Sequence, residues 1–250
     1  MPQPDFNAAR LFVDAPMSAG AVLELDRNQV NYLGNVLRLG SGDAVLVFNG
    51  RDGEWKAAIS GRKRPDQLTI LAQTRPQDRL PDIHLVFAPL KHARLDYMVQ
   101  KAVEMGASAL QPVMTRFTQA SRVNLDRMRA NVIEAAEQCG ILNLAVVHDP
   151  LPLEQYLTRR DQDRRLLFCD EQAPAENPVT ALTGIAGGVQ SGVDLLIGPE
   201  GGFAEEERTY LLRQAKISRL SLGPRILRAD TAAVAAMAIT QAMLGDWGGV

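Results

Sequence analysis

The chain carries LLIGPEGGF at residues 195–203 and LSLGPRILRADT at residues 220–231. Each stretch begins as an apolar run too short for a helix, reaches a Gly-Pro pair and leads into a helix signal. This pattern predicts strand, loop and helix twice. Ligands of α/β sheets bind in loops at the carboxyl ends of strands, so two adjacent strands would place both loops on one edge. Glycine admits close backbone approach and proline stiffens a loop, so we expect ligand binding through main-chain groups.

The composition is that of an ordinary globular protein. The chain has 250 residues, enough for one large or two modest domains, and 46% of them are hydrophobic. No apolar segment reaches the roughly 20 residues of a membrane span, and the first ten residues lack the pattern of a leader, so we expect a cytoplasmic protein. The two cysteines and three histidines show no metal-ligand spacing. We therefore expect neither a disulfide framework nor a metal site.

The charge balance argues against a generic nucleic-acid binder, because the formal net charge is −2. Local basic clusters remain candidates for phosphate contact. They are Arg62-Lys63-Arg64, Lys91-His92-Ala93-Arg94, Arg116 with Arg122, and Arg225 with Arg228. Any one of them, taken alone, is more typical of a solvated surface.

The first part of the chain predicts a small β domain. Strands are expected at residues 21–25, 44–48, 54–59 and 67–72, with residues 9–12 either an edge strand or a basic-aromatic opening. A capping box over residues 26–29 predicts a short helix, with Leu33 on its apolar face. Residues 74–81, with two prolines, predict a linker between residues 1–73 and 82–250.

Strands and helices alternate in the rest of the chain. Besides the two opening runs, strands are expected at residues 83–88, 110–114, 144–148 and 166–169, and helices at 95–105, 125–139, 153–157 and 231–243. This alternation predicts an open, mostly parallel α/β sheet. The last helix is apolar on nearly all sides, so we expect one face on the sheet and the other on a second subunit.

These residues also resemble a known family. The pair GPEGG and LGPRILRADTA, behind a β-rich segment, is similar to the ribosomal RNA small subunit methyltransferase E family of the SPOUT superfamily. NYLGNVLR at residues 31–38, QKAVEMG at 100–106 and EAAEQCG at 134–140 resemble further stretches of that family. Ile141 stands where the family has arginine. The resemblance covers nearly the whole chain and rests on motifs of fixed wording and order.

The resemblance implies a fold and a cofactor. Residues 1–73 would form a PUA-like β-barrel that binds RNA, and residues 82–250 a SPOUT domain. That domain would be a trefoil-knotted, mostly parallel sheet with helices on both faces. The knot would hold both loops around S-adenosylmethionine, and the last helix would form a homodimer. The implied cofactor-binding residues are Leu196, Ile197, Gly198, Glu200, Gly201, Gly202, Leu222, Gly223, Ile226, Leu227 and Arg228.

The reaction implied by the resemblance is methylation of N3 of a uridine in 16S rRNA of the small ribosomal subunit. N3 is protonated at neutral pH, so the site must help to remove that proton and hold N3 near the methyl group. The catalytic candidates are the carboxylates of Glu200 and Asp230 and the guanidinium groups of Arg225 and Arg228. Glu200 could equally shape its own loop. Asp230 could cap the last helix, and the family more often has glutamate at its place.

N3 lies on the Watson–Crick edge, so the target base must be unpaired or swung out before it reacts. The expected RNA contacts are Arg10, Arg38, Lys91, Arg94 and Arg116, with Arg10 reaching the pocket of a second subunit. The sequence leaves open which uridine is modified, whether free RNA or an assembled subunit is the substrate, and which residue takes the proton.

Two other functions fit the same motifs. One is a different SPOUT RNA methyltransferase that acts on a ribose hydroxyl or another base. The other is a non-enzymatic RNA-binding factor for ribosome assembly. A Rossmann enzyme is disfavoured, because its glycine fingerprint belongs in the first turn after a strand and none follows residues 83–88.

Overall fold

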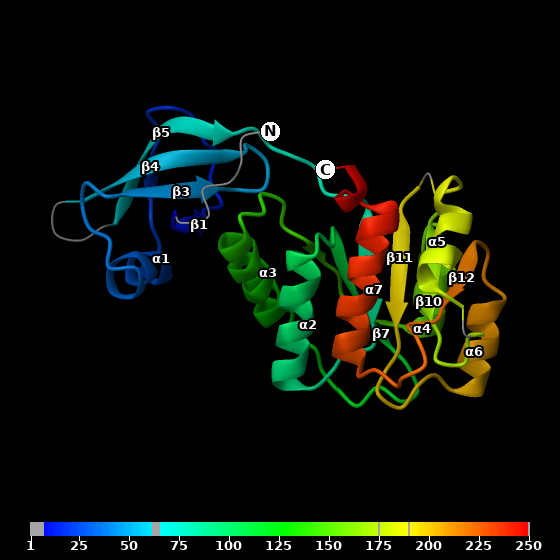
Figure 1. The fold of residues 1–250 in the computed structure, drawn as a ribbon. Coiled ribbons are helices and arrows are strands. Elements are labelled where there is room, and N and C mark those ends of the chain that lie inside the picture. The colour runs from blue at the N-terminus through cyan, green and yellow to red at the C-terminus, as the bar shows by residue number, and fades with distance from the viewer. Residues whose placement is uncertain (1–7, 62–65, 175, 190, 250) are drawn as a thin grey trace. The chain divides into compact units, whose positions relative to one another are not determined.

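The computed structural model describes residues 8–61, 66–174, 176–189 and 191–249 (Figure 1). The chain forms two compact units, Met1–Arg79 with Ile133–Leu144, and Leu80–Val132 with Ala145–Val250. Residues 133–139, the second half of the helix Leu125–Cys139, therefore belong to the first unit. The basic cluster Arg62-Lys63-Arg64 lies outside the described residues.

The first unit is built on a five-stranded sheet in the order β1-β3-β4-β5-β2. Its strands are β1 (Arg10–Phe12), β2 (Val22–Glu24), β3 (Ala44–Phe48), β4 (Glu54–Ser60) and β5 (Gln67–Arg75). β1 pairs parallel to β3 and the other pairs are antiparallel. Alternate side chains such as Val45, Val47 and Ile59 form the core of this unit, as the period of two requires. The expected strands are thus confirmed.

The predicted capping box starts the helix of this unit. In α1 (Arg27–Asn31), Asp26 Oδ1 accepts a hydrogen bond from Gln29 N at 2.9 Å, and Gln29 Oε1 accepts one from Asp26 N at 2.9 Å. The chain then continues as a wider π-helical turn, Tyr32–Val36, which buries Leu33 completely. Arg38 follows in the left-handed region with φ of 57° and has an exposed side chain.

Arg10 belongs to a buried ion-pair cluster. Its Nε lies 3.0 Å from Glu54 Oε2, and Arg75 Nη2 lies 2.8 Å from the same oxygen. Only 4% of Arg10 and 2% of Glu54 is exposed. The prediction that Arg10 contacts RNA conflicts with this burial. A buried carboxylate needs nearby cations, and Arg10 and Arg75 meet that need.

This cluster predicts an acid-dependent loss of stability. Burial raises the pKa of the Glu54 carboxyl, but hydrogen bonds from Arg75, Thr74 and Arg10 outweigh it, so the net pKa is lowered. A lowered folded-state pKa stabilises the fold above the unfolded-state pKa of about 4.3, and this contribution is lost as the pH falls through the folded value. Glu54→Gln should therefore destabilise strongly near pH 7, with a smaller difference from wild type below about pH 4.

Urea unfolding of both proteins at several pH values measures that difference. A difference that does not depend on pH would contradict the assignment of the charge to Glu54.

The second unit is built on a seven-stranded sheet in the order β12-β10-β11-β6-β7-β8, with β9 also paired to β7. All its pairs are parallel. The strands are β6 (Ile83–Phe87), β7 (Ala109–Met114), β8 (Val146–Val147), β9 (Leu151–Pro152), β10 (Arg165–Cys169), β11 (Val193–Ile197) and β12 (Ile217–Leu220). The predicted parallel sheet is confirmed, although the strand expected at residues 144–148 is reduced to the two residues of β8.

Helices cover both faces of this sheet. They are α2 (His92–Glu104), α4 (Leu153–Arg159), α5 (Pro178–Ala186), α6 (Glu205–Leu212) and α7 (Ala229–Leu244), followed by a 3-10 turn, Trp247–Gly249, whereas α3 (Leu125–Cys139) is divided between the two units. α4 and α6 bury Leu157 and Leu211 against Leu196 on one face. On the other face, α2, α5 and α7 pack side by side and α7 contacts β11 (Figure 1).

The sequence-predicted helix boundaries hold where local signals are strong. α3 has the expected bounds, and α2 ends before Gly106, whose φ of 78° only glycine adopts readily. α7 buries Ala233, Ala236 and Met237, while residues on its other side are half-buried. Within the described residues, no helix is long and apolar enough to cross a membrane.

Candidate active site

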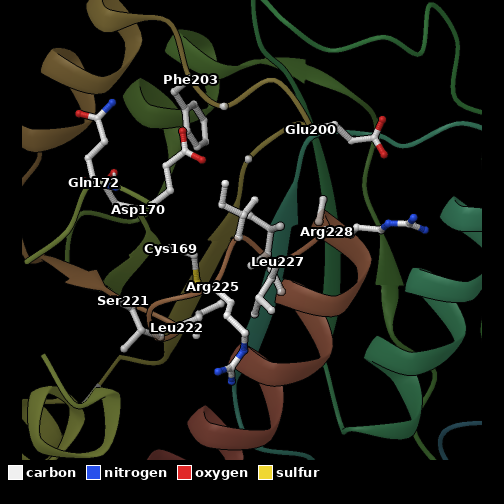
Figure 2. A pocket seen from close by; sticks show the side chains of 18 of the residues that line it. Cys169, Asp170, Gln172, Glu200, Phe203, Ser221, Leu222, Arg225, Leu227 and Arg228 are labelled. Atoms are coloured by element: carbon white, nitrogen blue, oxygen red, sulfur yellow. Dashed lines mark hydrogen bonds between the residues drawn. The ribbon is translucent and has the colours of Figure 1, made fainter. Parts of the chain in front are cut away.

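Both Gly-Pro loops line one cavity of about 350 Å³ at the carboxyl edge of the second sheet (Figure 2). β11 ends at Ile197 and supplies residues 197–200, 202 and 203. β12 ends at Leu220 and supplies residues 220–228. The expectation that the two loops meet at one ligand-sized space is therefore confirmed.

The expectation that the two strands are adjacent is wrong. β10 lies between them and pairs with β11 on one side and β12 on the other. The loop after β10 therefore enters the cavity between the two Gly-Pro loops, and it contributes residues 169–172. These residues were not among the expected site residues, although the strand expected at 166–169 ends at the same edge.

Glycine is required where the first loop turns closely. A Cβ built on Gly198 would lie 2.5 Å from the ring of Phe203, and that ring packs edge to face on Phe168 at 5.2 Å between centroids. Gly202 has φ of 70°, a conformation that other residues rarely adopt. The loop thus presents backbone to the cavity at Gly198 and Gly202, beside the side chains of Glu200 and Phe203.

Most of the expected cofactor-binding residues line this cavity. They are Ile197, Gly198, Glu200, Gly202, Leu222, Gly223, Ile226, Leu227 and Arg228. Leu196 does not, because it faces α4 and α6 and is fully buried in the core. Gly201 is also absent from the lining, and a Cβ at this position would lie 3.4 Å from Phe117.

The loop after β10 is held by a charge cluster. Asp170 is 5% exposed and pairs with Arg208 at 3.1 Å and with Arg219 at 2.8 Å. Beside it, burial raises the pKa of the Cys169 thiol to about 12, so Cys169 stays neutral at ordinary pH. A thiol in that state is a poor nucleophile, and Cys169 acts as apolar lining (Figure 2).

The two catalytic carboxylate candidates share one arginine. Arg94, at the start of α2, donates from Nε and Nη2 to the two oxygens of Asp230, both at 3.0 Å. Its Nη1 also contacts Glu200 Oε1. The structure therefore brings an expected RNA contact, Arg94, to two expected catalytic groups that lie far away in the sequence.

The two carboxylates differ in the hydrogen bonds that hold them and in their exposure to solvent. The hydrogen bond from Arg94 lowers the pKa of the Asp230 carboxyl below its ordinary value, and the Asp230 side chain is 16% exposed. Asp230 also accepts a hydrogen bond from Thr231 N, while Arg228 holds the N-cap position expected for Asp230. The side chain of Glu200 is 38% exposed and makes the more accessible of the two ion pairs.

Four of the remaining candidates lie at the same edge with exposed side chains, and Arg38 does not. Arg225 and Arg228 line the cavity, and Figure 2 shows Arg228 pointing toward the side of Glu200 and Arg225 pointing elsewhere. Lys91 follows β6, and Arg116 follows β7 and lies 3.4 Å from Glu206. Arg38 is part of the first unit. Among the described residues, no group of three or more histidine, cysteine, aspartate or glutamate side chains is placed to hold a metal ion.

Comparison with known proteins agrees with this geometry. The family model described as an RNA methyltransferase domain matches residues 77–241, and the RNA methyltransferase PUA domain matches residues 25–70. The chain is 31% identical over 241 residues to the ribosomal RNA small subunit methyltransferase E of Synechocystis sp., covering 95% of this chain and 78% of that one. The chain belongs to the ribosomal RNA small subunit methyltransferase E family.

Other relatives span the same length. The enzyme of this name from Rickettsia conorii is 29% identical over 231 residues, covering 92% of this chain and 93% of that one. The crystal structure of the family member from Neisseria gonorrhoeae, bound to S-adenosyl methionine, has 26% sequence identity to this chain and a TM-score of 0.84. The match covers 96% of this chain and 100% of that one. The resemblance of both the motifs and the fold is thus confirmed.

Proposed function

We propose that this protein uses S-adenosylmethionine to methylate N3 of a uridine in the 16S rRNA of the small ribosomal subunit. The observation that carries the proposal is the meeting of both Gly-Pro loops at one cavity of about 350 Å³. This volume is within the range of about 300–1,000 Å³ for small-molecule sites. Membership of the family and the cofactor-bound relative support the same conclusion.

The residues present suit this cofactor. Gly198, Gly202 and Gly223 offer backbone groups to its polar atoms, and the tight turn at Gly198 leaves no room for a Cβ. Ile197, Leu222 and Leu227 supply apolar surface for its adenine. Once bound, the cofactor supplies an electrophilic methyl group on a sulfonium. Leu196 and Gly201 support this pocket from outside its lining.

Glu200 and Asp230 have different roles in the proposed reaction. We assign proton acceptance from uridine N3 to Glu200, because its ion pair with Arg94 is accessible and such pairs contribute little stability. Asp230 is held by two hydrogen bonds from Arg94 that lower its pKa and weaken it as a base, so we assign it the role of anchoring Arg94. As the proton leaves N3, the N3 lone pair forms the new bond to the methyl carbon while the carbon–sulfur electrons stay on sulfur.

Arg228 is the candidate for electrostatic stabilisation of the reacting base. Arg228 lines the cavity on the side of Glu200 and would stabilise the negative charge that develops on the uracil ring. Arg228→Ala should lower kcat by about 100-fold without changing the thermal unfolding temperature. Methyl transfer by Arg213→Ala, which removes an exposed arginine outside the cavity, is the control. Unchanged turnover in Arg228→Ala would remove this residue from the mechanism.

Two further parts belong to the proposal. The half-buried side of α7, with Val234, Ala238 and Ile239, would pack against the same helix of a second subunit in the cytoplasm. The target base would be unpaired when it reacts, because N3 lies on its pairing edge.

Nucleoside analysis of ribosomal RNA from a deletion strain tests the reaction. Loss of 3-methyluridine is expected, whereas an altered ribose methylation pattern would point to a different SPOUT reaction. Absence of S-adenosylmethionine binding by the purified protein would favour an assembly factor. Methyl transfer to purified small subunits and to free 16S rRNA then identifies the substrate form.

A further inference from the structure

A second cavity, of about 490 Å³, opens at the same edge of the second unit. It lies between the start of α2, after β6, and residues 119–124, which follow β7 and precede α3. It shares no lining residue with the first cavity. We call it the basic cavity, after Lys91, His92, Arg122 and Arg127 in its lining.

The net charge of the basic cavity is positive. Asp96 is the acidic residue of its lining, and Arg127 already binds both Asp96 oxygens, at 2.9 and 2.6 Å. Asn131 donates a further hydrogen bond to Asp96 at 2.8 Å. Lys91 and Arg122 are exposed, and neither side chain has an ion-pair or hydrogen-bond partner within the described ranges. Two cations are therefore available for an anion.

The rest of the lining suits a nucleobase. Leu90, Leu95 and Met128 are buried and give the cavity an apolar floor. The amide of Gln119 can bond to the edge of a base, as can the NH2 group of Asn124, whose Oδ1 accepts a hydrogen bond from Arg127 N at 3.0 Å. An apolar surface for a ring, amides for its edge and cations for a phosphate are the groups that bind an unstacked nucleotide.

The chain itself connects the basic cavity to the first one. Arg94 lies in the first turn of α2, after Lys91, and contacts Glu200 in the first cavity. Between them, His92 has φ of 43°, a strained conformation for a residue other than glycine. Such strain concentrates at functional sites.

We propose that the basic cavity binds a nucleotide of the RNA strand adjacent to the target uridine. Lys91 and Arg122 contact its phosphate, and its base lies on the floor formed by Leu90 and Met128. The inference rests on the proposed function, which places an unpaired uridine at the first cavity. Its neighbours in the strand then need a binding site of their own.

Charge reversal tests the phosphate contacts in the full-length protein. Lys91→Glu and Arg122→Glu should each raise the KM for small ribosomal subunits by about 10-fold and leave the Kd for S-adenosylmethionine unchanged. The slope of log KM against log salt should fall by about one for each phosphate contact that a variant removes. Arg213→Glu makes the same charge change on an exposed residue outside both cavities and should keep the wild-type slope.

A neutral variant tests the space itself. Ser121 lines the basic cavity with an exposed side chain, so Ser121→Trp fills its mouth without changing charge. It should raise KM while the salt dependence stays at the wild-type slope. Thermal unfolding of each variant shows that the fold is retained.

The outcomes separate the possible failures. A KM and a salt slope equal to those of Arg213→Glu in all the cavity variants would overturn the proposal. The proposal would also be overturned if the cavity variants had a raised KM for small subunits but bound a single-stranded, uridine-containing RNA oligonucleotide as tightly as wild type. That result would assign the cavity to a ribosomal protein. A wild-type protein that methylates no RNA would instead reject the proposed function.

Discussion

Replacing Glu200 by alanine is expected to lower kcat for methyl transfer by about 100- to 10,000-fold, the usual contribution of a general base. Uridine N3 attacks only as its proton leaves, and Glu200 is an accessible carboxylate of the first cavity, paired with Arg94 and with 38% of its side chain exposed. Binding of S-adenosylmethionine should weaken little, because Gly198, Gly202 and Gly223 and the apolar side chains assigned to hold it remain in place. Single-turnover kinetics with small subunits measure the effect on the chemical step.

Glu200→Gln separates the base from the loop-shaping role. Glutamine keeps the size and the oxygen that contacts Arg94 but cannot accept a proton at neutral pH. It should therefore lose nearly as much activity as alanine. Glu205→Gln is the matched control, because Glu205 lies in the first turn of α6 and outside the cavity lining. If Glu200→Gln keeps wild-type turnover, Glu200 only positions its loop and Arg94.

Removing Asp194 is expected to destabilise the second unit by about 3–5 kcal/mol, the usual cost of breaking a buried ion pair. Asp194 lies in β11 and is 1% exposed. It accepts hydrogen bonds from Arg164 Nε at 2.6 Å and from the Tyr156 hydroxyl at 2.8 Å. Burial and the adjacent Asp194 charge raise the pKa of Tyr156 far above its ordinary value, so the phenol remains a donor. Asp194→Ala leaves the guanidinium groups of Arg164 and Arg160 buried without this counter-ion.

Chemical denaturation of Asp194→Ala against wild type measures this cost. Asp163→Ala is the matched control, because Asp163 pairs with Lys216 at 2.6 Å but the two side chains are 73% and 45% exposed. That surface pair should contribute little, since solvent screens it. Equal losses of unfolding free energy in the two variants would show that the buried Asp194 cluster stabilises the fold no more than the surface pair does.

Local chemistry explains the parts of the fold that the sequence predicts well. The capping box at Asp26, the helix end at Gly106 and the bounds of α3 each depend on residues within a few positions of one another. The Gly-Pro loops belong to the same class, because backbone freedom at Gly198 and Gly202 is a local property. These signals were enough to predict the parallel sheet and the edge at which its ligand site lies.

Long-range packing decided what local patterns do not contain. The position of β10 between β11 and β12 follows from which strands pair, and it brings the unpredicted residues 169–172 into the cavity. The burial of Arg10 depends on Glu54, 44 positions away. Arg94 and Asp230 are 136 positions apart, so their hydrogen bonds exist only in the folded chain.

The sequence by itself therefore determined the elements, the glycine-rich loops and the family of this protein, because side-chain periodicity and backbone freedom are set within a few residues. Only the tertiary structure decided the strand order, the fate of Arg10 and the sharing of Arg94 by two carboxylates. The physical reason is that burial and ion pairing are properties of the neighbours that folding brings together.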